Sequence, residues 1–120
     1  MSKLRKMKKA VNKYVLIICN HPDDAKANCK KYIADVKNLQ LIINSYIDQT
    51  ADLYQIWCDK SVKVFSLAEN NFFIRFIRSF KMLIVNHYLN KFSYKLCVAG
   101  ILERNLNILK QRLEQYEYLT

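Results

Sequence analysis

The sequence predicts an all-α fold, an antiparallel bundle of four or five long helices joined by short links. Gly100 is the only glycine and Pro22 the only proline among 120 residues, where an average chain of this length carries roughly 8 glycines and 6 prolines. Folds rich in strands need those residues for their turns. Apolar residues also recur at helical spacing along most of the chain. Because 52% of the residues are hydrophobic, a core can form, and we expect a single helical-bundle domain over residues 1–120.

A first helix is expected over residues 3–19. Its apolar positions recur every three or four residues: Leu4, Met7, Val11, Tyr14 and Ile18. The helix should end at Asn20 and His21, because the residue before a proline is displaced from the α region.

A long second helix is expected from residue 22 to about residue 59. Pro22 suits a first helical position, and Asp23 and Asp24 suit a first turn, where carboxylates meet the positive end of the helix dipole. A stripe with alternating steps of four and three then follows: Cys29, Tyr32, Val36, Leu39, Ile43, Tyr46, Thr50, Leu53 and Trp57. This 3.5-residue repeat is typical of a bundle or coiled-coil seam. The seam could pack within the chain or on a second copy in a homodimer.

The second half of the chain is expected to hold two more helices. Residues 61–70 could form a short strand or a helical turn, and residues 71–90 a helix. The expected inward stripe of that helix is Phe73, Phe76, Ile77, Phe80, Leu83, Ile84 and His87. A link at residues 90–93, with Ser93 as N-cap, should precede a last helix that runs to about residue 117. Gly100 lies inside that helix, where a close approach of two helices would explain it.

The balance of charge favours anionic partners. Twenty Lys and Arg against ten Asp and Glu give a net charge of +10, which suits nucleic acid or an acidic protein surface. No segment has the length of a transmembrane helix, and residues 3–19 lack the Trp and Phe of an interfacial helix, so a membrane partner is not expected. The four cysteines have no metal-type spacing and indicate buried free thiols in a reducing cytoplasm. The heavy use of Lys, Asn, Ile, Tyr and Phe fits a phage, a large DNA virus or a bacterium of low GC content.

Two basic segments are the candidate binding sites. The first is the lysine-rich face of residues 3–13: Lys3, Arg5, Lys6, Lys8, Lys9 and Lys13. In the second, Arg75, Arg78 and Lys81 recur every three residues beside phenylalanines, as in sites that hold single-stranded nucleic acid. We expect Phe72 to be exposed, and Tyr116 and Tyr118 near the C-terminus to offer further aromatic contacts. A solvated charged face and an aromatic core would also account for these patterns.

The most favoured function is therefore binding of nucleic acid without catalysis or cofactor. The alternative is a protein-interaction module that binds an acidic surface, such as a phage or viral inhibitor of a host complex or an immunity-type bundle. No glycine-rich phosphate loop or His-Glu-x-x-His spacing occurs in the sequence, and we expect neither a metal site nor catalytic residues.

A minor alternative comes from residues 14–24, which end in His21-Pro22-Asp23-Asp24. This segment resembles the first strand and metal loop of the zinc-dependent N-acetylglucosaminyl de-N-acetylase family. The resemblance implies a zinc hydrolase in which His21 and Asp24 are ligands, Asp23 is the general base and His87 completes the site. The other interpretation is a helix-breaking link that is followed by a proline-initiated helix.

Overall fold

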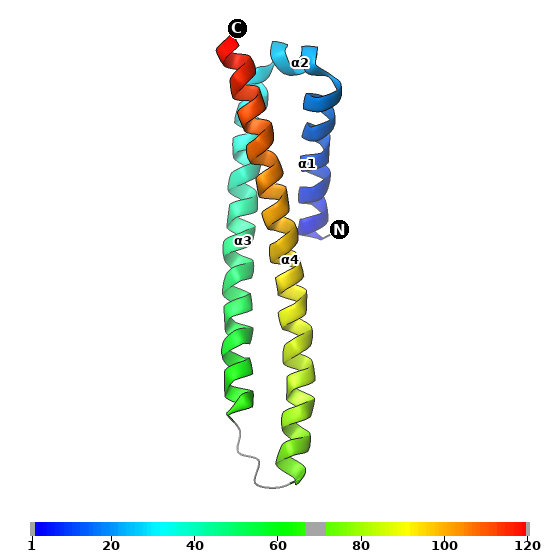
Figure 1. Cartoon of the computed structure of the whole chain (residues 1–120), viewed down its shortest axis with the longest axis vertical. Coiled ribbons are helices and arrows are strands. Elements are labelled where there is room, and N and C mark those ends of the chain that lie inside the picture. The colour runs from blue at the N-terminus through cyan, green and yellow to red at the C-terminus, as the bar shows by residue number, and fades with distance from the viewer. Residues whose placement is uncertain (1, 67–71, 120) are drawn as a thin grey trace. The chain divides into compact units, whose positions relative to one another are not determined.

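The computed structural model of the chain describes residues 2–66 and 72–119 and is all-α over those residues. It contains four helices: α1 (Lys3–Asn20), α2 (Pro22–Ala27), α3 (Cys29–Phe65) and α4 (Phe72–Leu119) (Figure 1). Three of these are long and α2 has six residues. The prediction of an all-α chain is confirmed over these residues, whereas the elements are divided differently from the prediction.

The chain falls into two compact units. Unit 1 comprises residues 1–47 and 98–120, and unit 2 comprises residues 48–97. Both α3 and α4 contribute residues to each unit.

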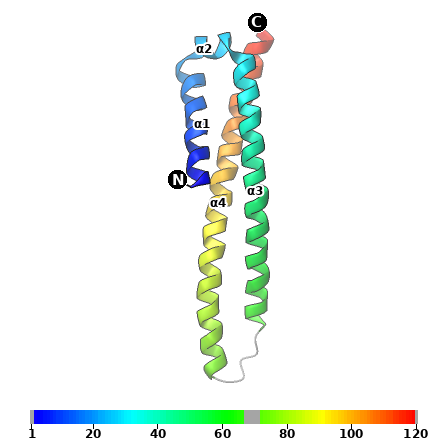
Figure 2. The ribbon, with the colours of Figure 1, turned by 180° about the vertical axis from the view of Figure 1, so that it is seen from behind.

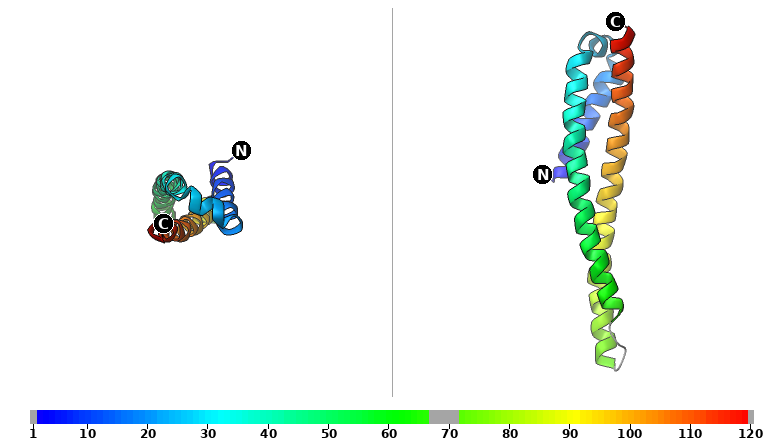
Figure 3. Two further views of the ribbon diagram at one scale, coloured as in Figure 1. Left: turned by 90° about the horizontal axis from the view of Figure 1, so that it is seen from above. Right: turned by 90° about the vertical axis from the view of Figure 1, so that its left-hand side faces the viewer.

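Unit 1 packs α1, α2 and parts of α3 and α4 around a continuous apolar core. The first turns of α3 and the last turns of α4 run beside α1, and α2 crosses from the end of α1 to the start of α3 (Figure 2 and Figure 3, left). The core draws on all four helices: Leu4, Met7, Val11, Ile18, Ala25, Cys29, Ile33, Val36, Leu39, Ile43, Tyr46, Ala99, Leu102, Leu106, Leu109 and Leu113. The apolar stripes predicted for residues 3–19 and for the start of the second helix therefore pack in the core of unit 1.

Polar contacts also join the helices of unit 1. The side-chain amide of Gln40 on α3 donates a hydrogen bond to Asn107 on α4. The guanidinium of Arg112 on α4 lies 3.4 Å from the sulfur of Cys19 on α1.

The boundaries of α1 follow its capping residues. The Ser2 hydroxyl accepts a hydrogen bond of 3.2 Å from the backbone N–H of Arg5, as an N-cap does. At the other end the N–H of His21 donates to the carbonyl of Ile17, and Pro22 then opens α2. The predicted helix over residues 3–19 is confirmed, as is the role of Pro22 at a helix start.

The prediction of one long helix from residue 22 to about residue 59 is wrong near its start, because the chain breaks at Asn28 between α2 and α3. The side-chain amide of Asn28 donates a hydrogen bond of 2.8 Å to the carboxylate of Asp24. The Tyr32 hydroxyl donates to the other oxygen of the same carboxylate, also at 2.8 Å. These bonds hold α2 against the first turn of α3.

Unit 2 is a pair of antiparallel helix segments, residues 48–65 of α3 and residues 72–97 of α4 (Figure 1). Trp57 and Tyr88 join them, with ring centroids 4.3 Å apart and planes inclined by 13°. Tyr88 is also near Phe92, at 6.4 Å. Lysines lie over these rings, with the Lys60 ammonium 4.2 Å from the Trp57 ring, a favourable cation–π distance.

Several predictions for the second half of the chain are corrected. The link at residues 90–93 does not exist, because α4 continues through it and Ser93 is inside the helix. Residues 61–65 are helical and belong to α3, so the short strand is wrong there, and residues 67–71 lie outside the described part.

Gly100 is not a point of close approach. A β-carbon built at Gly100 meets no described atom within 4 Å apart from its own stretch of helix. The glycine is therefore not required by the packing of the described residues.

The cysteines are free but not all buried. Cys29 is buried and Cys58 is half-buried, whereas Cys19 and Cys97 are exposed. The prediction of buried thiols therefore holds for Cys29 and is wrong for the two exposed ones, which lie outside the apolar stripes of α1 and α4.

Candidate functional site

The lysine-rich face of α1 is exposed in unit 1. All six of its cations are exposed, and most of them lie opposite the buried stripe of the helix: Lys3, Arg5, Lys6, Lys8, Lys9 and Lys13. No acidic residue occurs in α1 to neutralise them. The ammonium of Lys13 lies 5.8 Å from the ring of Tyr14. This face presents a dense positive charge of the kind that attracts phosphates.

A second cationic site lies in unit 2, where Arg75 and Arg78 of α4 meet Phe65 of α3. Together with Ser79 and Met82 they line an open groove of about 420 Å³. The guanidinium of Arg78 lies 5.3 Å from the centroid of the Phe65 ring, and the side chain of Phe65 is 61% exposed. We call this set the Arg/Phe groove. It offers charge for a phosphate and an open ring for stacking.

Lys81 does not line the Arg/Phe groove. A full helical turn takes 3.6 residues, so each side chain in a series spaced by three residues points in a different direction from the one before it. Lys81 instead joins Lys60 and Lys63 of α3 at a second groove of about 250 Å³. Its floor is apolar: Trp57, Val64, Ile84 and Val85. The three predicted cations of α4 are therefore shared between two grooves.

The phenylalanines in the first turns of α4 are exposed, contrary to the predicted inward stripe, whereas Phe92 is half-buried. Phe72 is exposed as expected, and Phe73, Phe76 and Phe80 are exposed as well. The buried residue of α4 in unit 2 is Val85, on the side of the helix that packs on α3. The phenylalanines and Leu83 of the predicted stripe are exposed to solvent. In contrast, Ile77 is half-buried, and Ile84 lines the groove with Lys60, Lys63 and Lys81.

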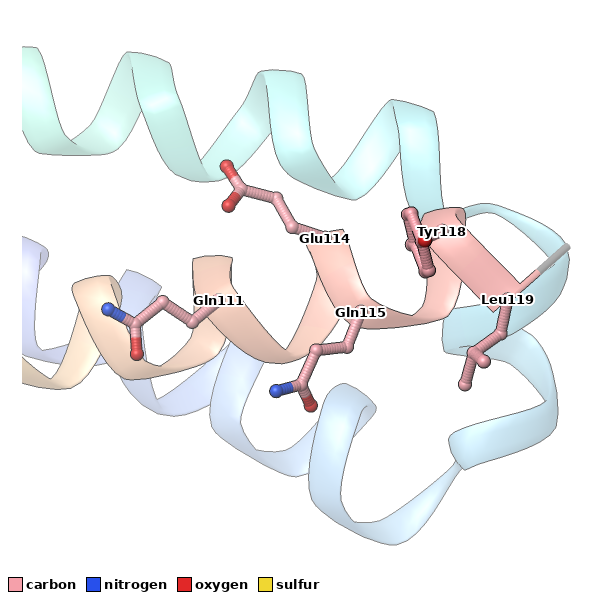
Figure 4. Close-up of a pocket in the computed structure, with 5 residues that line it drawn as sticks. All are labelled: Gln111, Glu114, Gln115, Tyr118 and Leu119. Carbon is pink, nitrogen blue, oxygen red and sulfur yellow. The ribbon is translucent and has the colours of Figure 1, made fainter.

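The two C-terminal tyrosines have different surroundings. Tyr116 packs against the core of unit 1, with the ammonium of Lys26 at 5.5 Å from its ring. Tyr118 is exposed and borders an open depression of about 500 Å³ that, among the described residues, is lined by the last turns of α4 (Figure 4). Glu114 is the charged side chain among these lining residues, and its negative charge does not suit an anion. The two rings do not form one aromatic surface.

Sequence reasoning missed part of these sites. Phe65 fell in a stretch whose structure was left open between strand and helix, so its pairing with Arg78 could not be anticipated. Lysines also gather around the break between α2 and α3: Lys26, Lys30 and Lys31. They line an open surface of about 480 Å³. The close spacing of these three lysines in the sequence was the signal that could have identified this surface.

The His21-Pro22-Asp23-Asp24 segment does not have the structure that the resemblance implies. Residues 14–20, expected to be a strand, are the end of α1. Both carboxylate oxygens of Asp24 accept hydrogen bonds, from Asn28 and Tyr32. Within residues 2–66 and 72–119, no three His, Cys, Asp or Glu side chains gather as a metal site requires.

Two tyrosines near this junction have perturbed acidity. The hydrogen bond to Asp24 raises the pKa of Tyr32 above its ordinary value of 10.0, because it favours the protonated phenol. Burial raises the pKa of Tyr14, and the neighbouring Asp35 raises it further. The two rings contact each other edge to face at 6.4 Å.

Comparison with known proteins finds no matching family model, no matching curated protein and no matching solved structure. Among the described residues, no helix combines the length and the apolar character that crossing a membrane requires.

Proposed function

We propose that the protein is a non-enzymatic binding protein that contacts single-stranded nucleic acid. The observation that carries the proposal is the Arg/Phe groove, where Arg75 and Arg78 lie beside the exposed ring of Phe65. Single-stranded nucleic acid is bound by cations along its backbone and by aromatic rings on which bases stack.

The cations of α1 support the same proposal. A phosphate backbone gains affinity from every cation that releases a counterion. Six exposed cations on one helix without an acidic residue would add sequence-independent affinity. In this account α1 contributes charge, and the Arg/Phe groove distinguishes single strands from duplexes.

Binding of labelled single-stranded oligonucleotides, measured by fluorescence anisotropy at several salt concentrations, tests the proposal. The affinity should fall steeply with salt, with a logarithmic slope of about −0.7 for each phosphate contact. The double variant Arg75→Glu/Arg78→Glu should flatten that slope by about 1.4. The control Lys37→Glu/Arg104→Glu makes the same change of charge at exposed positions of unit 1 and should have a much smaller effect.

The role of the ring has its own matched pair of variants. Phe65→Ala removes the ring beside Arg78, whereas Phe72→Ala removes an exposed ring outside the groove. Loss of one stacked base costs about 1–3 kcal/mol, so Phe65→Ala should weaken binding of single strands by about fivefold or more. Equal effects of the two variants, or an affinity that does not respond to salt, would contradict the proposal.

A second candidate function is binding of an acidic protein surface, which the groove of Lys60, Lys63 and Lys81 favours. Its apolar floor with lysines at the rim suits an amphipathic helix that carries carboxylates. In that case the triple variant Lys60→Glu/Lys63→Glu/Lys81→Glu should lose a protein captured from the native host, and nucleic acid should be absent from the captured material.

A further inference from the structure

The outer side of α4 in unit 2 carries a complete heptad seam that is exposed to solvent. Its positions alternate steps of three and four: Phe73, Phe76, Phe80, Leu83, His87, Asn90 and Tyr94. All seven are exposed. We call these residues the α4 seam. A 3.5-residue repeat of mainly apolar side chains is the pattern that packs against another helix.

The helix partner that α4 has within unit 2 is on its other side. Val85 is buried and Tyr88 stacks on Trp57 of α3. In an α-helix these positions lie roughly opposite Phe76 and Leu83, because each residue turns the chain by about 100°. The α4 seam is therefore left uncovered by α3.

The exposed apolar area is a large part of what a specific interface uses. The four aromatic residues of the α4 seam are 58–68% exposed, and an aromatic side chain buries 150–250 Å² when it is covered. They therefore offer roughly 500 Å², and the exposed Leu83 and the neighbouring Phe72 extend this surface. A standard interface buries about 800 Å² on each partner. The largest apolar patch of a typical monomer is about 300–600 Å², and such a patch is often functional.

The distribution of charge indicates what the occupant is. The α4 seam contains no charged residue, and the nearby cations Arg78 and Lys81 line the two grooves between α3 and α4 instead. An acidic partner would find no cation to pair with in the seam. A second copy of the same seam, in contrast, is mainly apolar, has a matching periodicity and contains no charged residue that would repel its counterpart.

We infer that the α4 seam is a self-association surface through which two copies of the chain form a closed dimer. The same patch would serve on both copies, as in a two-fold symmetric interface. The surface differs from the seam over residues 29–57 expected from the sequence, because in the structure that stripe supplies the core of unit 1 as far as Tyr46.

The test is the mass of the full-length protein in solution, measured by light scattering or sedimentation over a wide range of concentration. The wild-type protein should reach a mass twice the 14.3 kDa of the chain and go no further. The variant Phe80→Glu/Leu83→Glu should stay monomeric at every concentration. Its far-ultraviolet circular dichroism should be unchanged, because both side chains are already exposed.

The matched control is Leu41→Glu/Ile42→Glu, which introduces the same charges at exposed apolar positions of unit 1. This control should dimerise like the wild type. A wild type that stays monomeric, a seam variant that still dimerises, or a control that is equally impaired would overturn the inference. So would a monomeric wild type that binds lipid vesicles or a different protein through these phenylalanines, because the seam would then have another occupant.

Discussion

Unit 1 and unit 2 share the helices α3 and α4, yet they differ greatly in how much apolar surface they bury. In unit 1 sixteen residues form one core, because α1 adds a third helix. Among the described residues of unit 2, the buried side chains are Thr50, Val64 and Val85. A two-helix pair can cover only one side of each helix, so the other sides remain available for binding. The difference teaches that the packing of unit 1 accounts for stability, whereas the open surfaces of unit 2 are candidates for function.

The largest expected effect is the loss of a core residue in unit 1. Leu106 is fully buried in the core, and Leu→Ala at such a site costs about 2–5 kcal/mol because it leaves a cavity. Chemical denaturation should show this loss for Leu106→Ala. The exposed Val62→Ala in unit 2 should change stability by less than about 0.5 kcal/mol. Similar losses of stability for both variants would contradict the difference in packing between unit 1 and unit 2.

The next effect concerns the aromatic contact that joins α3 and α4 in unit 2. Trp57→Ala removes the stack on Tyr88 and should cost about 1–3 kcal/mol. Amide hydrogen exchange should accelerate in residues 48–65 and 72–97 and stay slow in the core of unit 1. Tyr54→Ala, at a half-buried aromatic position of the same helix, serves as the control and should have a smaller effect.

A smaller and opposite effect is expected at Gly100 in unit 1. A β-carbon there meets open space among the described atoms, and glycine inside a helix is less stable than alanine by roughly 0.5–1 kcal/mol. Gly100→Ala should therefore raise the denaturation midpoint. The reverse change next to it, Ala99→Gly, removes a buried methyl group and should lower the midpoint. If Gly100→Ala destabilised the protein instead, other atoms would have to lie closer to Gly100 than they do in the structure.

The smallest expected effect is the response of unit 1 to alkaline pH. Because the pKa of Tyr32 is raised in the folded state by its hydrogen bond to Asp24, the folded state holds this proton more tightly than the unfolded state does. That contribution is fully present below pH 10 and is lost as the pH rises through the folded pKa. Stability measured across this alkaline range should therefore fall less steeply for Tyr32→Phe than for the wild type. Identical slopes would contradict the proposed contact.

The sequence was sufficient to predict a helix where a continuous apolar stripe and a polar face run along its whole length. Ser2, the stripe from Leu4 to Ile18 and Pro22 each act locally, so α1 and its end were predictable. The break at Asn28 was missed because it depends on side-chain bonds to Asp24, and an asparagine inside a polar stretch gives little warning of them. The false link at residues 90–93 arose from Asn90, Lys91 and Ser93, which are polar because that part of α4 is largely exposed.

The candidate sites were predictable in charge but not in geometry. The cations of α1 were identified because charge and spacing are visible in the chain. The separation of Lys81 from Arg75 and Arg78 depends on where α3 packs, which periodicity does not give. The same holds for the phenylalanine stripe, because an exposed apolar face indicates that a partner should cover it but does not identify that partner.

The most direct test of the contrast between the units is amide hydrogen exchange of the full-length protein at low and at high concentration. At low concentration we expect slow exchange in α1, residues 29–47 and residues 98–119, and faster exchange in residues 72–97, although α4 is one helix. At high concentration residues 72–97 should become protected as the α4 seam is covered, and unit 1 should not change. Uniform protection along α4 at both concentrations would contradict the account.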